Sequence, residues 1–343
     1  MNKYHCYFKI FFVLLLPYTF SCSKSLNEQV SKDKIPVIYS EHYNIKLFGI
    51  QKLHPFDTEK PDKIHRFLKN EFNLSVDQFY EPLIVKNSEL LKVHTKHYLK
   101  SLNSSRTISE IAEIGPLKFL PPSMLKRKIL RPMKYSTGGT LLSVDIAVKK
   151  GLAVNLSGGY HHAKANSGEG FSFYADINLA VNKLKEKYNK KSIMIVDLDA
   201  HQGNGYESII KDDTCVHIFD IYNEDIFPND NDVKKYIDYN LPISKFTTDV
   251  QYLKILENEL PKAIEISKPD FIIFNAGTDV FLGDVLGMLT ISENGIIERD
   301  EFVFKCAYDN NIPLIMLLSG GYSRKSANIT SESIANILKK FYF

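Results

Sequence analysis

Carboxylate and imidazole side chains gather where one apolar segment ends. Residues 192–198 form an apolar run typical of a buried strand, and Asp199 and His201 follow it directly. Because side chains alternate along a strand, Asp197, Asp199 and His201 would lie on one side. Carboxylates at the end of a buried strand are costly unless they are paired or bind a cation. The spacing therefore predicts a metal site. The alternative is a capped strand end whose aspartates accept backbone N–H groups.

Two adjacent histidines follow a second apolar segment. Residues 153–156 lead into Gly158 and Gly159, and then into His161 and His162. Imidazole titrates near neutral pH and glycines permit close approach of the backbone, so the pair suits proton transfer. The same pair also fits an ordinary surface or core position. Taken alone, it favours a structural role.

Two further apolar segments end in single polar groups. Asp279 follows residues 271–274, and Tyr322 stands after the Ser-Gly-Gly turn that follows residues 314–318. In an open α/β sheet the carboxyl ends of parallel strands meet at one edge, where ligands bind. Each of these ends could be a turn by itself. The four together predict one site on which the polar side chains converge.

Strand-like and helix-like segments alternate along the body of the chain, which predicts an α/β fold with a mostly parallel sheet covered by helices on both faces. The strand-like segments are residues 35–39, 153–156, 192–198, 216–219, 271–274 and 314–318, and the helix-like segments are residues 175–190, 250–266, 300–308 and 331–340. Residues 115–132 contain prolines and are expected to form a long loop or lid. No boundary divides the body, so residues 35–343 are expected to form a single domain.

These strings resemble the histone deacetylase superfamily, and most of all its class IV branch. The shared motifs are Gly-Gly-x-His-His, Asp-x-Asp-Ala-His-Gln-Gly-Asn-Gly, Asn-Ala-Gly-Thr-Asp and Ser-Gly-Gly-Tyr, together with Lys-Leu-His-Pro-Phe-Asp at residues 52–57. The resemblance runs from about residue 35 to the C-terminus. It implies the arginase/deacetylase fold, a three-layer α/β/α domain, and a zinc-dependent hydrolase that removes acyl groups from N-acyl-lysine in a protein or peptide.

The resemblance also implies a metal site. Its zinc ligands would be Asp199, His201 and Asp279, a set that leaves an open coordination position for catalysis. Iron in place of zinc remains open. The family further suggests a structural potassium ion near Asp197, Asp199 and His201, held largely by main-chain oxygens, with Asp220 as a contributor.

Around the metal the resemblance assigns roles to individual side chains. His161 and His162 would handle protons, Asp197 would orient His161, and Tyr322 would donate its hydroxyl to the oxyanion. Many relatives carry an aspartate behind the second histidine where this chain has Asn204. An amide cannot offset an imidazolium charge, so His162 should be less basic here. The walls of the acyl-lysine channel would be Phe171 and Phe227.

Several other functions fit parts of the pattern. Arginase-like enzymes use two manganese ions and carry a further aspartate where this chain has Gly203, so a second metal would lack a ligand. Acetylpolyamine amidohydrolases share the metal and the histidine pair, which keeps a small acylated amine open as substrate. Class IV resemblance also permits long fatty acyl groups. A catalytically silent protein that binds acylated ligands is the third alternative.

The first residues predict export. Lys3 and Lys9 precede the apolar residues 10–16, and Ser21 and Cys22 follow, so residues 1–22 resemble a bacterial lipoprotein signal in which the cysteine is acylated. An ordinary cleaved signal or an uncleaved anchor are the alternatives. Residues 23–34 would form a tether. The protein is thus expected in the bacterial envelope, with membrane association only through its N-terminus, or else soluble in the periplasm or secreted. There, acylated peptides, polyamines or envelope components are more plausible substrates than histones.

Composition limits the remaining classes of function. The 343 residues include 43 basic and 40 acidic side chains and carry a net charge of +3, so we expect no direct nucleic-acid binding. Beyond the signal only Cys215 and Cys306 remain, both in apolar segments. They are expected to be core residues, and neither a disulfide nor cysteine chemistry is expected.

Overall fold

The computed structural model describes residues 30–31, 33–211 and 213–343. The predicted signal, and residues 23–29 of the predicted tether, lie outside this range. The sheet and the helices below all belong to one compact unit, Lys32–Phe343. Among the helices of the described residues, none has the length and apolar character needed to cross a membrane.

A seven-stranded sheet forms the centre of this unit, and every pair of neighbouring strands in it is parallel. The strand order is β1-β2-β7-β6-β3-β4-β5. The strands are β1 (Val37–Ile38), β2 (Leu152–Asn155), β3 (Ile193–Asp197), β4 (Val216–Asn223), β5 (Tyr239–Ile243), β6 (Phe271–Asn275) and β7 (Leu314–Leu317). Strands buried on both faces read as continuous apolar runs, which is why six of the seven were predicted from sequence.

The edge strand β5 is the one that the sequence analysis missed. Its residues alternate between partly buried and exposed, and it contains Pro242. Proline lacks the N–H that a central strand needs, and it is tolerated at an edge. A short, alternating, proline-containing segment carries a weak strand signal for this reason.

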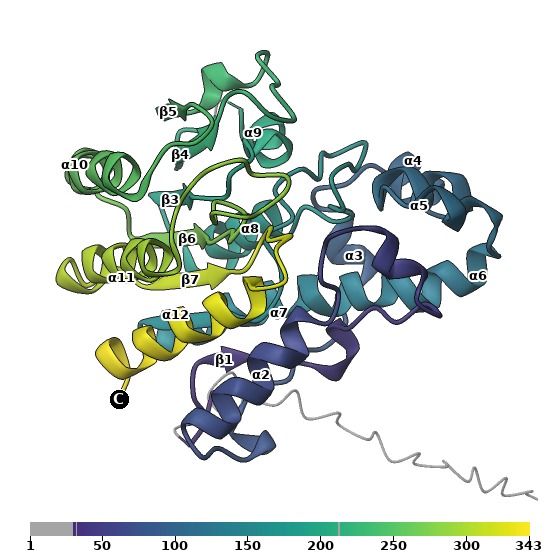
Figure 1. Cartoon of the computed structure of the whole chain (residues 1–343), viewed down its shortest axis with the longest axis horizontal. Helices are drawn as coiled ribbons and strands as arrows, with labels where there is room; N and C mark the ends of the chain where they lie inside the picture. Colours follow the sequence, from purple (N-terminus) through teal and green to yellow (C-terminus); the bar gives the residue numbers. More distant parts are fainter. Residues whose placement is uncertain (1–29, 32, 212) are drawn as a thin grey trace, which may run out of the picture. The chain divides into compact units, whose positions relative to one another are not determined.

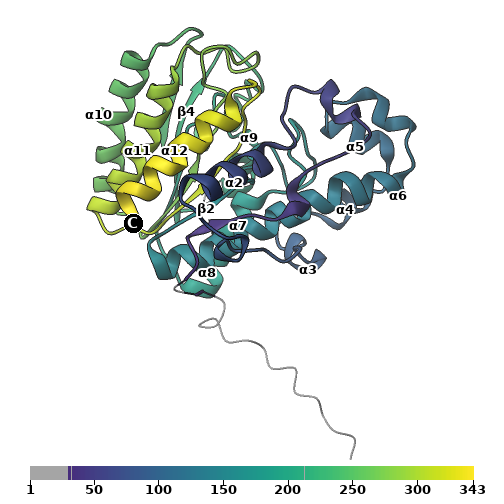
Figure 2. The same cartoon turned by 60° about the horizontal axis from the view of Figure 1, so that its bottom comes forward.

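Helices cover both faces of the sheet, so the predicted three-layer α/β fold is confirmed. Figure 2 shows α10, α11 and α12 together above the sheet and α7 and α8 below it. The long helices are α2 (Lys60–Glu71), α7 (Arg131–Lys150), α8 (Asp176–Tyr188), α10 (Asp249–Ser267), α11 (Glu293–Asp309) and α12 (Ser326–Phe341). The shorter ones near the sheet are α9 (Asn204–Ile210), η1 (Glu41–Tyr43), η2 (Ile50–Leu53), η3 (Val76–Gln78) and η6 (Lys234–Tyr236). The helices predicted at residues 175–190, 250–266, 300–308 and 331–340 are α8, α10, α11 and α12, the last two beginning earlier than expected.

A group of short helices, residues 87–130, forms what we call the helical lobe (Figure 1). It contains α3 (Asn87–Leu90), α4 (Lys96–Ser101), α5 (Ser105–Ile111), η4 (Gly115–Phe119), α6 (Pro122–Leu125) and the π-helical turn η5 (Lys126–Leu130), which continues into α7. Its core is a separate apolar cluster that also takes in Phe171, Phe173 and Tyr174.

The prediction of a long loop or lid at residues 115–132 is wrong, because these residues are mostly helical. Pro132 follows the π-helical turn η5 inside a continuous helical stretch, whereas Pro116 and Pro122 occupy first-turn positions of η4 and α6. There a missing N–H costs little and the fixed φ angle suits a helix. Prolines that mark helix starts were therefore mistaken for loop residues.

The two cysteines of the body, Cys215 and Cys306, have free thiols. Both are only partly buried, so they lie at the margin of the core and not inside it as expected.

Candidate active site

Polar side chains from four strand ends meet at one edge of the sheet. His161 and His162 follow β2, Asp199 follows β3, Asp279 follows β6, and Tyr322 follows β7. These strands are neighbours in the order β2-β7-β6-β3, and all are parallel. Their carboxyl ends therefore lie side by side, as the topology of an open α/β sheet requires.

Asp199, His201 and Asp279 form a buried cluster suited to a metal ion. One ligand atom from each lies within 4.8 Å of the others. His201 Nδ1 is 3.1 Å from Asp199 Oδ1 and 2.9 Å from Asp279 Oδ2. Two buried carboxylates that face one another repel unless a positive charge lies between them. A donor set of two oxygens and one nitrogen suits a catalytic zinc ion.

Backbone N–H groups fix the orientation of the Asp199 and Asp279 carboxylates. Gly320 N donates to Asp199 Oδ2 at 2.8 Å, and Ala200 N donates to Asp279 Oδ1 at 2.9 Å. The loops approach so closely that a Cβ on Gly277 would lie 2.1 Å from Asp199 Oδ2. A Cβ on Gly320 would lie 2.5 Å from Asp279 Oδ2. Only glycine fits at positions 277 and 320, because a Cβ at either position would clash with a carboxylate of the cluster.

Burial and neighbouring charges shift the pKa values of all three side chains of this cluster. Burial and the charge of Asp199 raise the pKa of Asp279 to about 7. Burial would raise the pKa of Asp199 too, but His161 and His201 hold it well below its ordinary value. The pKa of His201 rises to about 10 against the effect of burial, because both carboxylates accept hydrogen bonds from it. A divalent cation would displace these protons, since metal ligands bind in their deprotonated forms.

His161 is held by a carboxylate at the end of β3. Its Nδ1 is 3.0 Å from Asp197 Oδ2, and its Nε2 is 3.6 Å from Asp199 Oδ1. Asn275 Nδ2 donates to Asp197 Oδ1 at 2.9 Å and fixes that carboxylate in turn. Burial would lower the pKa of His161, but Asp199 and Asp197 raise it to about 9. Asp197 thus lies where the predicted orienting residue should be.

His162 has a different partner and a different charge state. Its Nδ1 is 2.8 Å from Asn204 Oδ1, while Asn204 Nδ2 donates to Glu169 Oε1 at 2.7 Å. The amide nitrogen of Asn204 donates to the Glu169 carboxylate, so the amide oxygen must accept from His162 Nδ1–H. His162 Nε2 is then left with a free lone pair. Burial and the charges of His161 and His201 hold the pKa of His162 well below its ordinary value. His162 is therefore a neutral base near neutral pH.

Tyr322 stands beside the cluster. Its ring centroid lies 6.0 Å from that of His201, with the two rings nearly perpendicular. Asp284 accepts the backbone N–H of Tyr322 at 2.6 Å and so anchors the turn. Burial and the charges of Asp279 and Asp199 raise the pKa of the Tyr322 phenol well above its ordinary value. The hydroxyl stays protonated and can donate a hydrogen bond.

The two predicted channel residues occupy different positions. Phe227 is 46% exposed and its ring centroid lies 5.0 Å from that of His162, so it stands at the open side of the site. Phe171 is buried, and its ring packs on Phe56 at 5.0 Å and on His54 at 5.6 Å.

His54 and Phe56 also contact the ring of Tyr322, at 6.0 and 6.2 Å. No role was predicted for these two residues, although they belong to the Lys-Leu-His-Pro-Phe-Asp motif.

A buried lysine, Lys60, was not predicted at all. Its Nζ donates to Gly320 O at 3.1 Å and to Thr278 Oγ1 at 3.2 Å. Burial lowers its pKa to about 8 even though nearby carboxylates act in the opposite direction. Lys60 begins α2, so one side chain joins this helix to the loops after β6 and β7.

A second group of carboxylates lies behind the histidines. Glu207 and Asp220 are fully buried, and Glu207 Oε1 and Asp220 Oδ1 have no hydrogen-bond donor among the described residues. Gly203 N donates to the other oxygen of Asp220 at 3.1 Å. Burial raises the pKa of Asp220 well above its ordinary value and that of Glu207 to about 8. Glu207 and Asp220 also hydrogen-bond each other, so the pair can hold either a shared proton or a cation between its oxygens.

The parallel sheet and the Asp-His-Asp cluster at its edge define a class, the proteins of the arginase/deacetylase fold. Within it, this chain belongs to the histone deacetylase family, since residues 54–338 match the histone deacetylase domain. The resemblance to the histone deacetylase superfamily is therefore confirmed.

Individual relatives agree with this assignment. The chain is 42% identical over 311 residues to histone deacetylase 2 of Arabidopsis thaliana, covering 91% of this chain and 80% of the relative. It is 30% identical over 290 residues to an uncharacterized protein of a Picosynechococcus species, covering 84% and 92%. Human histone deacetylase 1 is 28% identical over 284 residues, covering 79% of this chain and 58% of the human protein. The crystal structure of the HDA15 HD domain superposes with a TM-score of 0.70 at 19% identity over 89% of this chain, which shows the shared fold.

Proposed function

We propose that this member of the histone deacetylase family is a zinc-dependent deacylase that hydrolyses N-acyl-lysine in peptides or proteins. The observation that carries the proposal is the buried cluster of Asp199, His201 and Asp279 beside a neutral His162. It combines a place for a cation with a base whose lone pair is free. Such a pairing is what metal-assisted amide hydrolysis needs.

Asp199, His201 and Asp279 would hold the zinc ion. When bound, zinc supplies Lewis acidity, which polarises an amide carbonyl and makes water more acidic. The backbone donors from Ala200 and Gly320 keep both carboxylates aimed inward, so little reorganisation is needed on binding. Metal analysis of the protein as isolated separates zinc from iron.

The histidines differ in a way that suits opposite proton transfers. His162 donates its Nδ1 proton to Asn204, so its Nε2 can accept a proton from the attacking water. His161 lies against Asp197, whose charge favours the protonated ring. It is therefore suited to give a proton to the leaving amine. Both roles rest on the hydrogen bonds behind the rings.

Tyr322 would stabilise the oxyanion, and aromatic rings would guide the substrate. A phenol that stays protonated can donate to developing negative charge. Phe227 at the open side and Phe171 beside Phe56 offer apolar surface to the methylene stem of an acyl-lysine. We therefore assign them to the channel.

Of the two alternative activities, one is disfavoured by a particular residue. An arginase-like second metal would need a ligand at Gly203. A Cβ there would lie 2.1 Å from Tyr206 Cε1, so a side chain does not fit. A small acylated amine in place of acyl-lysine is chemically equivalent at the metal cluster, and only substrate tests distinguish it.

The experiment is a substrate panel with zinc-loaded protein. Acetyl-, octanoyl- and myristoyl-lysine peptides and an acetylated polyamine are incubated with the wild type and with Asp279→Ala. We expect wild type to release acid from at least one lysine peptide and Asp279→Ala to release none. Cleavage of the acetylated polyamine alone would show that the substrate is a small acylated amine and not an acyl-lysine peptide. No cleavage by zinc-loaded protein, with Asp279→Ala still binding one equivalent of zinc, would overturn the proposal.

We also propose a structural cation, potassium by resemblance, behind the histidines. The donor-free oxygens of Glu207 and Asp220 support it, and main-chain oxygens near Asp197 would complete the coordination. Thermal unfolding in potassium against tetramethylammonium salts should show higher stability in potassium. Equal stability at matched ionic strength would contradict it.

For localisation we propose export with lipidation at Cys22. The support is the sequence of residues 1–22 alone. In bacterial cells fed labelled palmitate, the wild type should incorporate label and Cys22→Ser should not. Label that persists in Cys22→Ser would leave an ordinary cleaved signal or an uncleaved anchor.

A further inference from the structure

A cavity of about 400 Å³ lies between the helical lobe and the start of α7, and none of its lining residues belongs to the active site. Its apolar wall comes from four leucines on α3, α4 and η5: Leu90, Leu99, Leu102 and Leu130. Its volume falls within the range of small-molecule pockets. Three of the four, Leu90, Leu102 and Leu130, are buried and belong to the apolar core of the lobe.

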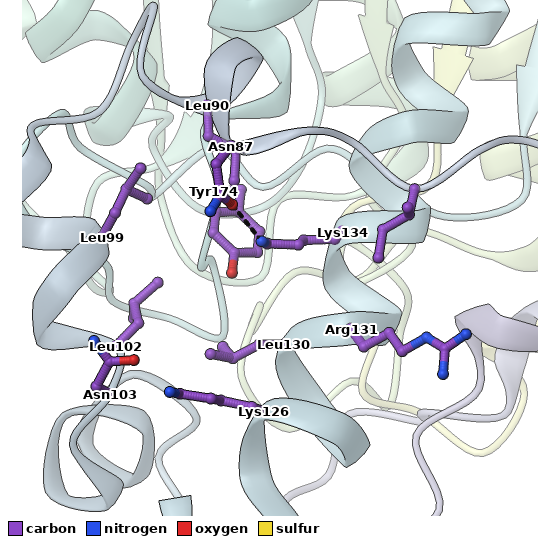
Figure 3. Close-up of a pocket in the computed structure, with 11 residues that line it drawn as sticks. Asn87, Leu90, Leu99, Leu102, Asn103, Lys126, Leu130, Arg131, Lys134 and Tyr174 are labelled. Atoms are coloured by element: carbon purple, nitrogen blue, oxygen red, sulfur yellow. Dashed lines mark hydrogen bonds between the residues drawn. The ribbon is translucent and has the colours of Figure 1, made fainter. Parts of the chain in front are cut away.

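Positive charge accompanies this apolar wall. Figure 3 shows Lys134 reaching toward Asn87, while Lys126 extends along the opposite wall and the Arg131 guanidinium points away. Lys134 Nζ donates to Asn87 Oδ1 at 2.6 Å. Lys134 is half-buried, and that burial lowers its pKa. No aspartate or glutamate is found among the described residues that line the cavity. The cavity therefore favours an anion.

A buried phenol completes the site. Tyr174 is 1% exposed, and the structure gives its hydroxyl no hydrogen-bond partner among the described residues. In Figure 3 this hydroxyl points into the cavity. Its neighbour Tyr98 behaves differently, since the Tyr98 hydroxyl donates to Phe173 O at 2.8 Å. The Tyr174 hydroxyl oxygen is not among the buried polar atoms without a partner, so it opens to the cavity and can donate to a ligand there.

We propose that the cavity binds a medium-chain carboxylic acid. The chain would lie against the leucines, and the carboxylate would accept from Lys134 and Tyr174, with Lys126 adding long-range attraction. An apolar wall with cations at one end matches an amphiphilic anion better than a fully polar one. Of the amphiphilic anions, a fatty acid is compact enough for both its chain and its charge to be enclosed.

The position of Tyr174 links this cavity to the histidine loop. Two residues on, Asp176 accepts the N–H groups of Gly159 and Tyr160, each at 2.9 Å. That carboxylate holds the loop that carries His161. A ligand on Tyr174 therefore touches the segment from which the loop is anchored. The binding site itself goes beyond the proposed function and does not depend on it.

Calorimetric titration of the full chain with decanoate tests the proposal. We expect saturable binding with one site, and much weaker binding of decanamide, which has the same chain without the charge. Lys134→Met should weaken binding about tenfold or more, because a charge-assisted hydrogen bond is lost while the apolar stem is kept. Tyr174→Phe should weaken it several-fold. Lys128→Met is the control, since Lys128 lies on η5 near the cavity but lines a different hollow, and it should leave binding unchanged.

A second arm separates this cavity from the active site. Decanoate could also occupy the proposed substrate channel as a product, so titration of Asp279→Ala is included. Binding to Asp279→Ala with the wild-type constant supports the lobe cavity, whatever the enzymatic activity proves to be. Loss of binding in Asp279→Ala, or equal binding of decanoate by wild type, Lys134→Met and Tyr174→Phe, overturns the proposal. If Lys134→Met fails to fold, the binding of decanoate by Tyr174→Phe still tests the proposed site.

Discussion

The active-site edge and the cavity of the helical lobe both contain buried polar side chains, but these side chains differ in their hydrogen-bond partners. At the edge two chains of hydrogen bonds hold the histidines: Asn275 contacts Asp197, which contacts His161, and Glu169 contacts Asn204, which contacts His162. In the cavity the Tyr174 hydroxyl stands without a partner. Chains of hydrogen bonds fix orientation and charge state in advance, as catalysis requires. A hydroxyl that opens to a cavity and has no partner among the described residues is instead free to donate to a ligand. The predictions below test this contrast.

The largest effect is expected at Tyr322, the donor proposed for the oxyanion. Tyr322→Phe removes one hydroxyl and keeps the ring contacts with His54 and Phe56. We expect kcat on the best acyl-lysine peptide to fall about 10²- to 10³-fold with little change in KM, as for the loss of one oxyanion donor. Steady-state kinetics with zinc-loaded protein measure this. A loss below tenfold would remove Tyr322 from the proposed mechanism.

Acid should weaken the helical lobe through His94, which lies next to Tyr98 in the lobe. His94 is 2% exposed, and its Nε2 accepts the N–H of Ala175 at 2.9 Å. Burial lowers its pKa from 6.5 to about 4. The folded state thus resists a proton that the unfolded state takes up, so stability is lost as pH falls from about 6.5 toward 4.

Complete protonation of His94 should lower the free energy of unfolding by roughly 3 kcal/mol. Urea unfolding at pH 7 and pH 4.5 should show a drop that is smaller in His94→Gln, whose amide can still accept from Ala175. The same pH dependence in both proteins would count against His94.

A smaller loss is expected when the chain of contacts behind His162 is broken. Asn204→Ala leaves the ring without its oriented partner and should lower kcat about 10- to 100-fold. Asn204→Asp supplies a charge in place of the amide oxygen, so the pKa of His162 should rise. The acidic limb of kcat/KM against pH should then shift to higher pH, because the base stays protonated longer. An unshifted profile in Asn204→Asp would show that this residue does not set the basicity of His162.

The smallest effect compares two neighbouring tyrosines of the lobe. Tyr98→Phe removes a hydroxyl that donates to Phe173 O and should destabilise the protein by about 1 kcal/mol. Tyr174→Phe removes an unpaired hydroxyl and should be neutral or slightly stabilising. Chemical unfolding of both variants without added ligand gives the two values. Equal destabilisation by both would mean that the Tyr174 hydroxyl has a partner and that the contrast between the regions is false.

The parts of the molecule that were predicted from sequence share a local signal. Six strands are continuous apolar runs, and the metal cluster follows strand ends in short motifs. His161, His162 and Tyr322 needed the family motifs because a histidine pair or a tyrosine after a glycine turn has many ordinary explanations. Asp197 was assigned by the same resemblance, and it lies against His161 as expected.

The parts that were not predicted depend on contacts between distant residues. Lys60 reaches Thr278 across 218 positions of the chain, and nothing around Lys60 distinguishes it from a surface lysine. Asn275 and Glu169 act only through the side chains that they touch. The lobe was misjudged for a different reason: a proline at the first turn of a helix and a proline in a loop look alike in one sequence.

The order of the strands has a consequence for how the protein is made. β7 (Leu314–Leu317) is the last strand in the chain, yet it lies between β2 and β6 in the middle of the sheet. Until the ribosome has released residues 314–317, the sheet has a gap at its centre, and the turn that carries Gly320 and Tyr322 does not exist. The carboxylate of Asp199 then lacks its backbone donor from Gly320. A nascent chain therefore cannot assemble the cluster of Asp199, His201 and Asp279 in its final form, and binding of the proposed metal would report completed synthesis and folding.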